Sequence, residues 1–97
     1  MIIYKRTDGT AYFGWDFSPE LPEGEVILGT STVKVYDSDG TDVTSTFVSK
    51  KTIDGNEIDV VIAKVGVEGE DYQVKFIGKT DNLEPVHAIT LKVRDSG

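Results

Sequence analysis

The chain has 97 residues, which is enough for one domain and too few for two. It contains no cysteine, so disulfides and thiolate chemistry are excluded, and no apolar run approaches the roughly 18 residues of a membrane-spanning helix. Seventeen acidic residues against ten basic ones give a formal net charge of −7, which disfavours the phosphate backbone of a nucleic acid as a partner. We therefore expect a single domain that binds neither nucleic acid nor membrane.

The start of the chain, MIIYKRTDGT, places its charges after its apolar residues, so it predicts no signal peptide. Residues 1–9 are polar and turn-like apart from Ile2, Ile3 and Tyr4. We expect this segment to be partly mobile or to extend the edge of a sheet. One β-sandwich domain should then span residues 10–97.

The remainder of the chain has the pattern of an all-β protein. Val, Thr, Ile, Tyr and Phe dominate, turn residues interrupt them at intervals of about 8 to 12, and apolar residues do not recur with a helical period. The two prolines between Ser18 and Gly24 exclude a central strand there, and Leu21 should anchor that crossing segment. The predicted strands are 10–17, 25–29, 32–36, 43–50, 58–65, a strand beginning at Tyr72, and 86–94; 25–29 and 32–36 are either separate or one strand kinked at Gly29.

Side-chain alternation assigns faces to these strands. Phe13, Trp15 and Phe17 recur at every second position and should face the core. The segment 58–65 is apolar on both faces, which indicates a central strand, and the last strand gathers its aliphatic residues on one face with His87 at the rim. About seven strands at this spacing predict an immunoglobulin-like or fibronectin-type antiparallel β-sandwich.

The stretch from Gly66 to Lys79, GVEGEDYQVKFIGK, joins a glycine-rich acidic turn to a strictly alternating strand. Tyr72, Val74 and Phe76 share one face of that strand. A tyrosine at this place predicts a tyrosine corner, in which the hydroxyl bonds back to the backbone near the preceding turn. The alternative is that Tyr72 is an aromatic recognition residue.

Two acidic clusters raise the question of metal binding. The turn Asp37–Asp42, DSDGTD, is either a weak calcium loop or an Asp-rich hairpin turn. An EF-hand-like loop needs Gly at the sixth position and Glu at the twelfth, where this sequence has Asp42 and Val48, so the turn is favoured. A solvated turn is likewise favoured for the second cluster. That cluster consists of Glu68, Glu70 and Asp71.

No pattern in the sequence points to catalysis or to a cofactor. His87 is the only histidine, which excludes a multi-histidine zinc site, and no motif supplies the strained serine of a catalytic triad. The glycines near Tyr72 precede a strand and not a helix, so they form no phosphate cradle. We expect a protein that is not an enzyme and holds no cofactor or metal. Its best residues for surface contacts are Tyr4, Tyr12 and Tyr36.

Two sequence blocks stand out when the chain is taken as a whole. The first is YFGWDFS at residues 12–18, followed by LPEGEVI at 21–27. The second is GVEGEDYQV at residues 66–74, closed by ITLKVR at 89–94. Over about residues 10–95, this pattern resembles a family of small phage and prophage proteins described as fiber–tail adaptor or tail accessory proteins.

The resemblance implies an immunoglobulin-like sandwich with a structural role in the tail of a virion, and no catalysis. It implies other tail or fiber proteins as partners, together with further copies of the chain in the assembled particle. The protein would reside in the cytoplasm of the bacterial host during assembly and then in the virion. The alternative is a carbohydrate- or cell-surface-binding sandwich, in which Tyr36 or Tyr12 stacks on a sugar beside loop carboxylates.

Overall fold

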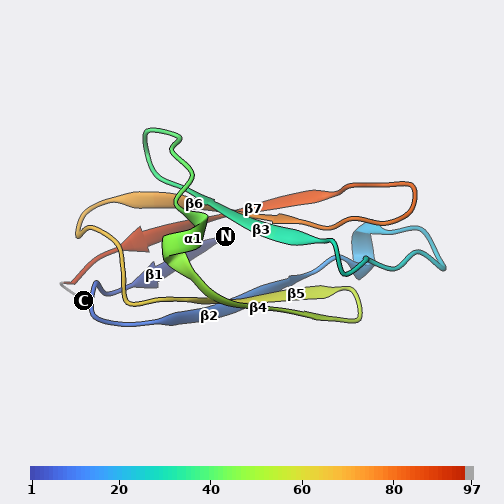
Figure 1. The fold of residues 1–97 in the computed structure, drawn as a ribbon, viewed down its shortest axis with the longest axis horizontal. Helices are drawn as coiled ribbons and strands as arrows, with labels where there is room; N and C mark the ends of the chain where they lie inside the picture. The colour runs from blue at the N-terminus through green and yellow to red at the C-terminus, as the bar shows by residue number, and fades with distance from the viewer. Residues whose placement is uncertain (96–97) are drawn as a thin grey trace.

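Strands with alternating buried and exposed side chains form two packed sheets in the computed structural model, which describes residues 1–95 (Figure 1). The last two residues of the predicted domain, 96–97, lie outside the described residues. One sheet has the strand order β1-β7-β6-β3, with β1 at Ile2–Lys5, β7 at Val86–Val93, β6 at Asp71–Ile77 and β3 at Thr32–Tyr36. The other has the order β2-β5-β4, with β2 at Ala11–Asp16, β5 at Glu57–Ile62 and β4 at Val48–Asp54.

This strand order is that of an immunoglobulin-like sandwich. The orders β2-β5-β4 and β7-β6-β3 correspond to the B-E-D and G-F-C strands of that fold. The predicted all-β sandwich is therefore confirmed, and β5 is the central strand of its sheet, as its apolar sequence indicated. One pair departs from the antiparallel prediction, because β1 runs parallel to β7.

The core lies between the two sheets and is filled by the inward-facing residues of both. Phe17 is fully buried, as predicted, whereas Phe13 and Trp15 are only half-buried, because β2 is an edge strand. Phe13 still meets the core, since its ring packs edge-on against Phe76 with the centroids 6.0 Å apart. The fully or nearly fully buried apolar residues are Phe17, Ile27, Val33, Val35, Phe47, Ile58, Val60, Ile62, Tyr72, Val74, Phe76, Ile89, Leu91 and Val93.

The Tyr72 hydroxyl closes a tyrosine corner. Tyr72 is buried at the start of β6, and its hydroxyl oxygen accepts a hydrogen bond of 3.1 Å from the backbone N–H of Val67. Gly66, directly before Val67, has a φ of +115° and lies so close to Val93 that a Cβ would come within 2.9 Å of Val93 Cγ2. Tyr72 is therefore a structural residue, and the glycines of this turn serve the backbone.

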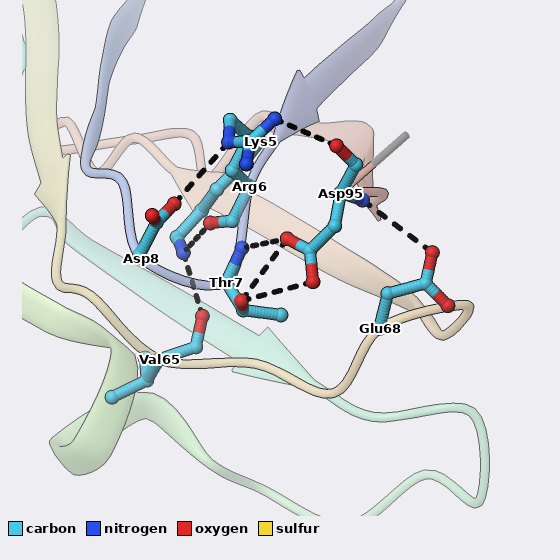
Figure 2. A network of polar contacts seen from close by, with 7 residues as sticks. All are labelled: Lys5, Arg6, Thr7, Asp8, Val65, Glu68 and Asp95. Atoms are coloured by element: carbon cyan, nitrogen blue, oxygen red, sulfur yellow. Dashed lines mark hydrogen bonds and ion pairs between the residues drawn. The ribbon is translucent and has the colours of Figure 1, made fainter. Parts of the chain in front are cut away.

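The N-terminal segment is an edge strand held to the end of β7. Lys5 is buried, and its Nζ donates hydrogen bonds of 2.7 Å to the backbone carbonyls of Arg6 and Val65 (Figure 2). Asp95 accepts a hydrogen bond of 2.8 Å from the backbone N–H of Thr7. Residues 1–9 were expected to be either a mobile segment or an extension of a sheet edge. The structure shows a sheet extension, formed by β1.

The strand predicted at residues 25–29 was wrong. This segment is irregular, and its backbone forms single hydrogen bonds to separate parts of the molecule instead of a ladder. The N–H of Ile27 donates to Asn56 Oδ1 at 3.1 Å, and the N–H of Leu28 donates to the carbonyl of Lys79 at 2.6 Å. Ile27 is buried all the same, so its apolar character reflects a tertiary contact. A 3-10 turn, Ser18–Glu20, precedes the segment, and Leu21 packs against the core as predicted.

The prediction of a strand at residues 43–50 was partly wrong, because this segment contains the short helix α1, Thr44–Phe47, before the strand starts. Asp42 accepts a hydrogen bond from the N–H of Thr44, and the N–H of Phe47 donates to the carbonyl of Val43, which closes one helical turn. The turn buries Phe47, and only then does β4 begin. The predicted anchor at Phe47 is therefore correct although its local structure is not.

We predict that Tyr72→Phe lowers the free energy of unfolding by about 1 kcal/mol, because the hydrogen bond between the hydroxyl of the buried Tyr72 and the N–H of Val67 is lost. Chemical denaturation measures the change. Tyr12→Phe is the matched control, since the Tyr12 side chain is 73% exposed and its hydroxyl is free to bond to water. Equal midpoints for both variants and the parent would contradict the tyrosine corner as a source of stability.

Candidate functional site

The acidic turn at residues 37–42 uses its carboxylates to hold its own backbone. Asp37 Oδ1 accepts hydrogen bonds from two backbone N–H groups of the turn, each at 2.9 Å. Asp42 Oδ1 accepts from the hydroxyl and the N–H of Thr44 at 2.5 and 2.8 Å. These two bonds, the hydroxyl first, hold the pKa of Asp42 below its ordinary value. Asp37 thus holds the turn itself, and Asp42 holds the first residue of the segment that follows it.

The second acidic cluster is dispersed among different partners. Asp71 forms ion pairs with Arg94 at 2.7 Å and with Lys92 at 3.2 Å, and hydrogen bonding, to Arg94 first, lowers the pKa of Asp71. Glu70 accepts a hydrogen bond of 3.2 Å from the hydroxyl of Ser38. Within residues 1–95, no group of three or more His, Cys, Asp or Glu side chains is arranged to hold a metal ion.

His87 stacks on Trp15 between the two sheets. The ring centroids are 3.4 Å apart and the planes differ by 7°. Trp15 Nε1 donates a hydrogen bond of 2.7 Å to Glu20, whereas the buried His87 Nε2 has no hydrogen-bond partner within the described part of the chain. No serine approaches the imidazole through a hydrogen bond among these residues, so the structure brings no nucleophile to it.

Lys5 is a buried ionisable residue that the sequence pattern did not single out. Burial lowers the pKa of Lys5, and the negative charges of Asp8 and Asp95 act in the opposite direction. A buried lysine can be a nucleophile, but the Lys5 ammonium is bonded to two backbone carbonyls. Its geometry therefore serves to hold the chain where β1 passes into β2 (Figure 2).

The sheet edges differ in how far they are protected against a further strand. The edge of β3 is covered, because Val35 bonds through its N–H to Thr44 and through its carbonyl to the N–H of Val43. The edge of β4 carries Lys50 and Lys51 and has an irregular register near Val48. Lysines and bulges are the usual means of blunting an edge. β1 spans only four residues.

β2 presents the longest unprotected edge, which we call the open edge and define as Ala11–Asp16. The N–H of Phe17 bonds to the carbonyl of Asn56 at the end of the β2–β5 ladder. In an antiparallel pair, every second residue bonds to the neighbouring strand, and the residues between turn their backbone groups to the other side. The N–H and C=O groups of Tyr12, Gly14 and Asp16 therefore point away from β5. The open edge contains no lysine, proline or register shift. It is therefore a ready template for strand addition.

The solvent face beside the open edge is acidic. The register pairs Asp16 with Glu57 and Glu57 with Asp54, and Asp59 lies two residues along the same face of β5. We call these four residues the acidic face. Hydrogen bonding with the Asp59 side chain raises the pKa of Glu57, and the negative charges of Asp59, Asp16 and Asp54 raise it further. The four carboxylates therefore repel one another.

Part of the acidic face is visible in the sequence. Glu57 and Asp59 alternate with Ile58 and Val60, which places both acids on one side of a strand. The Asp54-Gly55 turn adds Asp54 through a local hairpin. Only the pairing of β2 with β5 adds Asp16, about forty positions away in the chain, so the sequence did not predict the complete acidic face.

Comparison with protein-family models and with curated proteins yields no match to this chain. In residues 1–95, the helices are too short and too polar to cross a lipid bilayer. The candidate functional site is therefore defined by geometry alone: the open edge of β2 together with the acidic face beside it.

We predict that Glu57→Gln raises the melting temperature at pH 7 by about 1–2 °C. A raised pKa in the folded state means that ionised Glu57 destabilises the fold, and this penalty grows as the pH rises above about 4.3, the ordinary pKa of a glutamate. At pH 3 the gain should vanish, because Glu57 is then protonated in both states. Glu84→Gln, in an exposed loop, is the control for the change in net charge. Equal effects of the two variants at pH 7 would rule out repulsion within the acidic face.

Proposed function

We propose that this protein is a non-enzymatic adaptor or accessory module of a phage or prophage tail, which joins tail or fiber proteins through protein–protein contacts. The two sequence blocks that resemble such proteins support the proposal. The first block contains most of the open edge, and the second contains the tyrosine corner at Tyr72. A module of this kind would assemble in the cytoplasm of the bacterial host and persist in the virion.

The single observation that carries the proposal is the open edge on a rigid sandwich. Natural β-proteins blunt or cover their edges, and three edges of this protein are short, covered or lysine-bearing. The edge of β2 is left with three outward-facing backbone positions, on a strand whose other side is bound to the central strand β5. An edge of this kind supplies main-chain hydrogen bonds to an extended partner. The proposed mechanism is docking of a tail component on this edge.

The proposal predicts that the protein co-purifies with phage particles. An epitope-tagged copy is expressed in the bacterium that carries the gene, the prophage is induced, and particles are separated by density gradient. The tagged protein should appear in the particle fraction, cross-linked to a tail or fiber subunit, while the tag fused to an unrelated sandwich domain should not. Particles that form normally and lack the protein would sink the proposal.

A hollow on the β3-β6 face favours a second candidate function, carbohydrate or cell-surface binding. The hollow has a volume of about 500 Å³ and includes an aromatic ring, a carboxylate and amide and ammonium donors. Such a combination can stack on and hydrogen-bond a sugar. Its lining residues are Tyr36, Asp37, Ser38, Gly40, Gln73 and Lys75.

This second function predicts a defined set of ligands on a glycan array. Tyr36→Ala should weaken the glycan binding about tenfold, since the stacking surface is lost. The Lys75 ammonium lies 5.3 Å from the Tyr36 ring centroid, so Lys75→Ala tests whether the cation competes with a sugar for that ring. An array without ligands eliminates this candidate and leaves the tail proposal unaffected.

A further inference from the structure

We infer that the open edge binds an extended segment in which basic residues alternate with apolar ones. The inference rests on the proposed function and names the chemistry of the partner at that site. The open edge provides the backbone hydrogen bonds. The acidic face favours basic side chains on one side of the incoming strand. The half-buried Phe13 and Trp15 favour apolar side chains on its other side.

The first step concerns the solvent side of the added strand. A strand paired with β2 places every second side chain beside Tyr12, Gly14 and Asp16, whose positions share the solvent face of β2. The acidic face begins at this point, with Asp16 on the edge and the Glu57 carboxylate in the adjacent position of β5. Opposite charges on neighbouring strands stabilise a sheet, whereas acids there would add to repulsion that already raises the pKa of Glu57. Arginine or lysine therefore fits these positions.

Because Gly14 has no side chain, the Asp59 carboxylate of β5 can interact with a side chain on the far side of β2. The position that a Cβ of Gly14 would occupy is filled by Asp59 Oδ1 and lies 2.7 Å from the carbonyl of Ile58, so the Asp59 carboxylate takes the place of a side chain here. A basic residue opposite Gly14 thus faces a carboxylate directly, although Asp59 belongs to the next strand. This arrangement places negative charge within reach at two alternate positions, beside Gly14 and beside Asp16.

The second step concerns the inner side of the added strand. Phe13 and Trp15 point inward from the open edge and stay half-buried. β1 pairs with β7 only from Thr90 onward, so it does not reach the Trp15–His87 stack, and both residues stay half-buried. The inward side chains of an added strand would lie over these rings, and apolar residues there would remove aromatic surface from water. The alternation of basic and apolar residues follows from the two sides together.

Charge also disfavours a second copy of this chain as the occupant. Two β2 strands paired edge to edge would join two acidic faces into one surface, and each chain carries a formal net charge of −7. Like charges on adjacent strands destabilise a sheet. A partner segment of opposite charge has the reverse effect, and it also associates faster at low ionic strength.

The experiment measures binding of a synthetic peptide to the full chain. The probe is about eight residues long, alternates arginine with valine and has blocked ends. Calorimetry or fluorescence anisotropy should detect binding, and the amides of Tyr12 and Gly14 should become protected from hydrogen exchange. A peptide with the same composition in scrambled order, and one with glutamate in place of arginine, should each bind at least about tenfold more weakly. Equal binding of all three peptides would overturn the inference.

Protein variants separate the backbone from the charge. Tyr12→Pro removes an outward N–H without touching the β2–β5 ladder and should abolish binding, whereas Tyr12→Thr keeps that N–H and should weaken binding far less. Glu57→Gln with Asp59→Asn should weaken binding about tenfold at low salt. Asp39→Asn with Glu68→Gln makes the same charge change away from the acidic face and should not. Binding that is indifferent to Tyr12→Pro in a folded protein would sink the strand-addition geometry.

If Tyr12→Pro does not fold, N-methylated peptides test the same geometry on the unaltered protein. Methyl groups on the amides of one residue class, arginine or valine, should abolish binding, and methyl groups on the other class should be tolerated. In an antiparallel pair the sensitive class is arginine, and in a parallel pair it is valine. Equal sensitivity of both classes would contradict strand addition.

The outcomes for this site and for the proposed function are distinguishable. A protein that is absent from particles but binds the peptide through its open edge refutes the tail function and upholds the site. A protein that enters particles but does not bind the peptide, and enters equally well as Tyr12→Pro, upholds the tail function and refutes the site.

Discussion

The parallel ladder between β1 and β7 is held at its end by Lys5, whose buried ammonium bonds to the carbonyls of Arg6 and Val65. A buried ammonium is stable only when its hydrogen-bonding capacity is met, so this contact constrains where the first strand can lie. Because β1 is bound to β7, it cannot cover β2. The sandwich thereby gains a fourth strand on one sheet, and the edge strand β2 of the other sheet has no strand on the side opposite β5.

The distribution of charge gives that unpaired edge its chemical character. Some acidic side chains at turns are engaged by neighbouring residues, as Asp37 is by two N–H groups of its own turn and Asp42 is by Thr44. Glu57 and Asp59 instead face other carboxylates across strands, with no lysine or arginine among the causes that set the pKa of Glu57. Mutual repulsion on one face is a cost to the isolated fold. A cationic partner would relieve this cost, which links the stability of the sandwich to the kind of segment that fits its edge.

The tyrosine corner and its glycines show why a conspicuous motif can be structural. The turn before β6 combines a positive φ at Gly66 with close packing against Val93, and the Tyr72 hydroxyl satisfies the N–H of Val67. These contacts fix the start of β6, in which buried side chains alternate with exposed or half-buried ones. A rigid strand of this kind holds the sheets in place, and binding residues then belong to the edges and loops that the sheets support.

The sequence by itself determined the features that depend on near neighbours. Alternation placed Tyr72, Val74 and Phe76 inward because side chains on a strand alternate whatever its partner is, and the tyrosine corner spans only five positions. The tertiary structure alone decided the features that depend on pairing between distant segments. The sequence around Ile27 predicted a strand, because a buried apolar residue in an irregular segment has the same local pattern as one in a strand. Hydrogen bonds to Asn56 and Lys79 hold that segment in an irregular form. The burial of Lys5, the partner of β1 and the meeting of Asp16 with Glu57 likewise follow from strand order, which local periodicity does not encode.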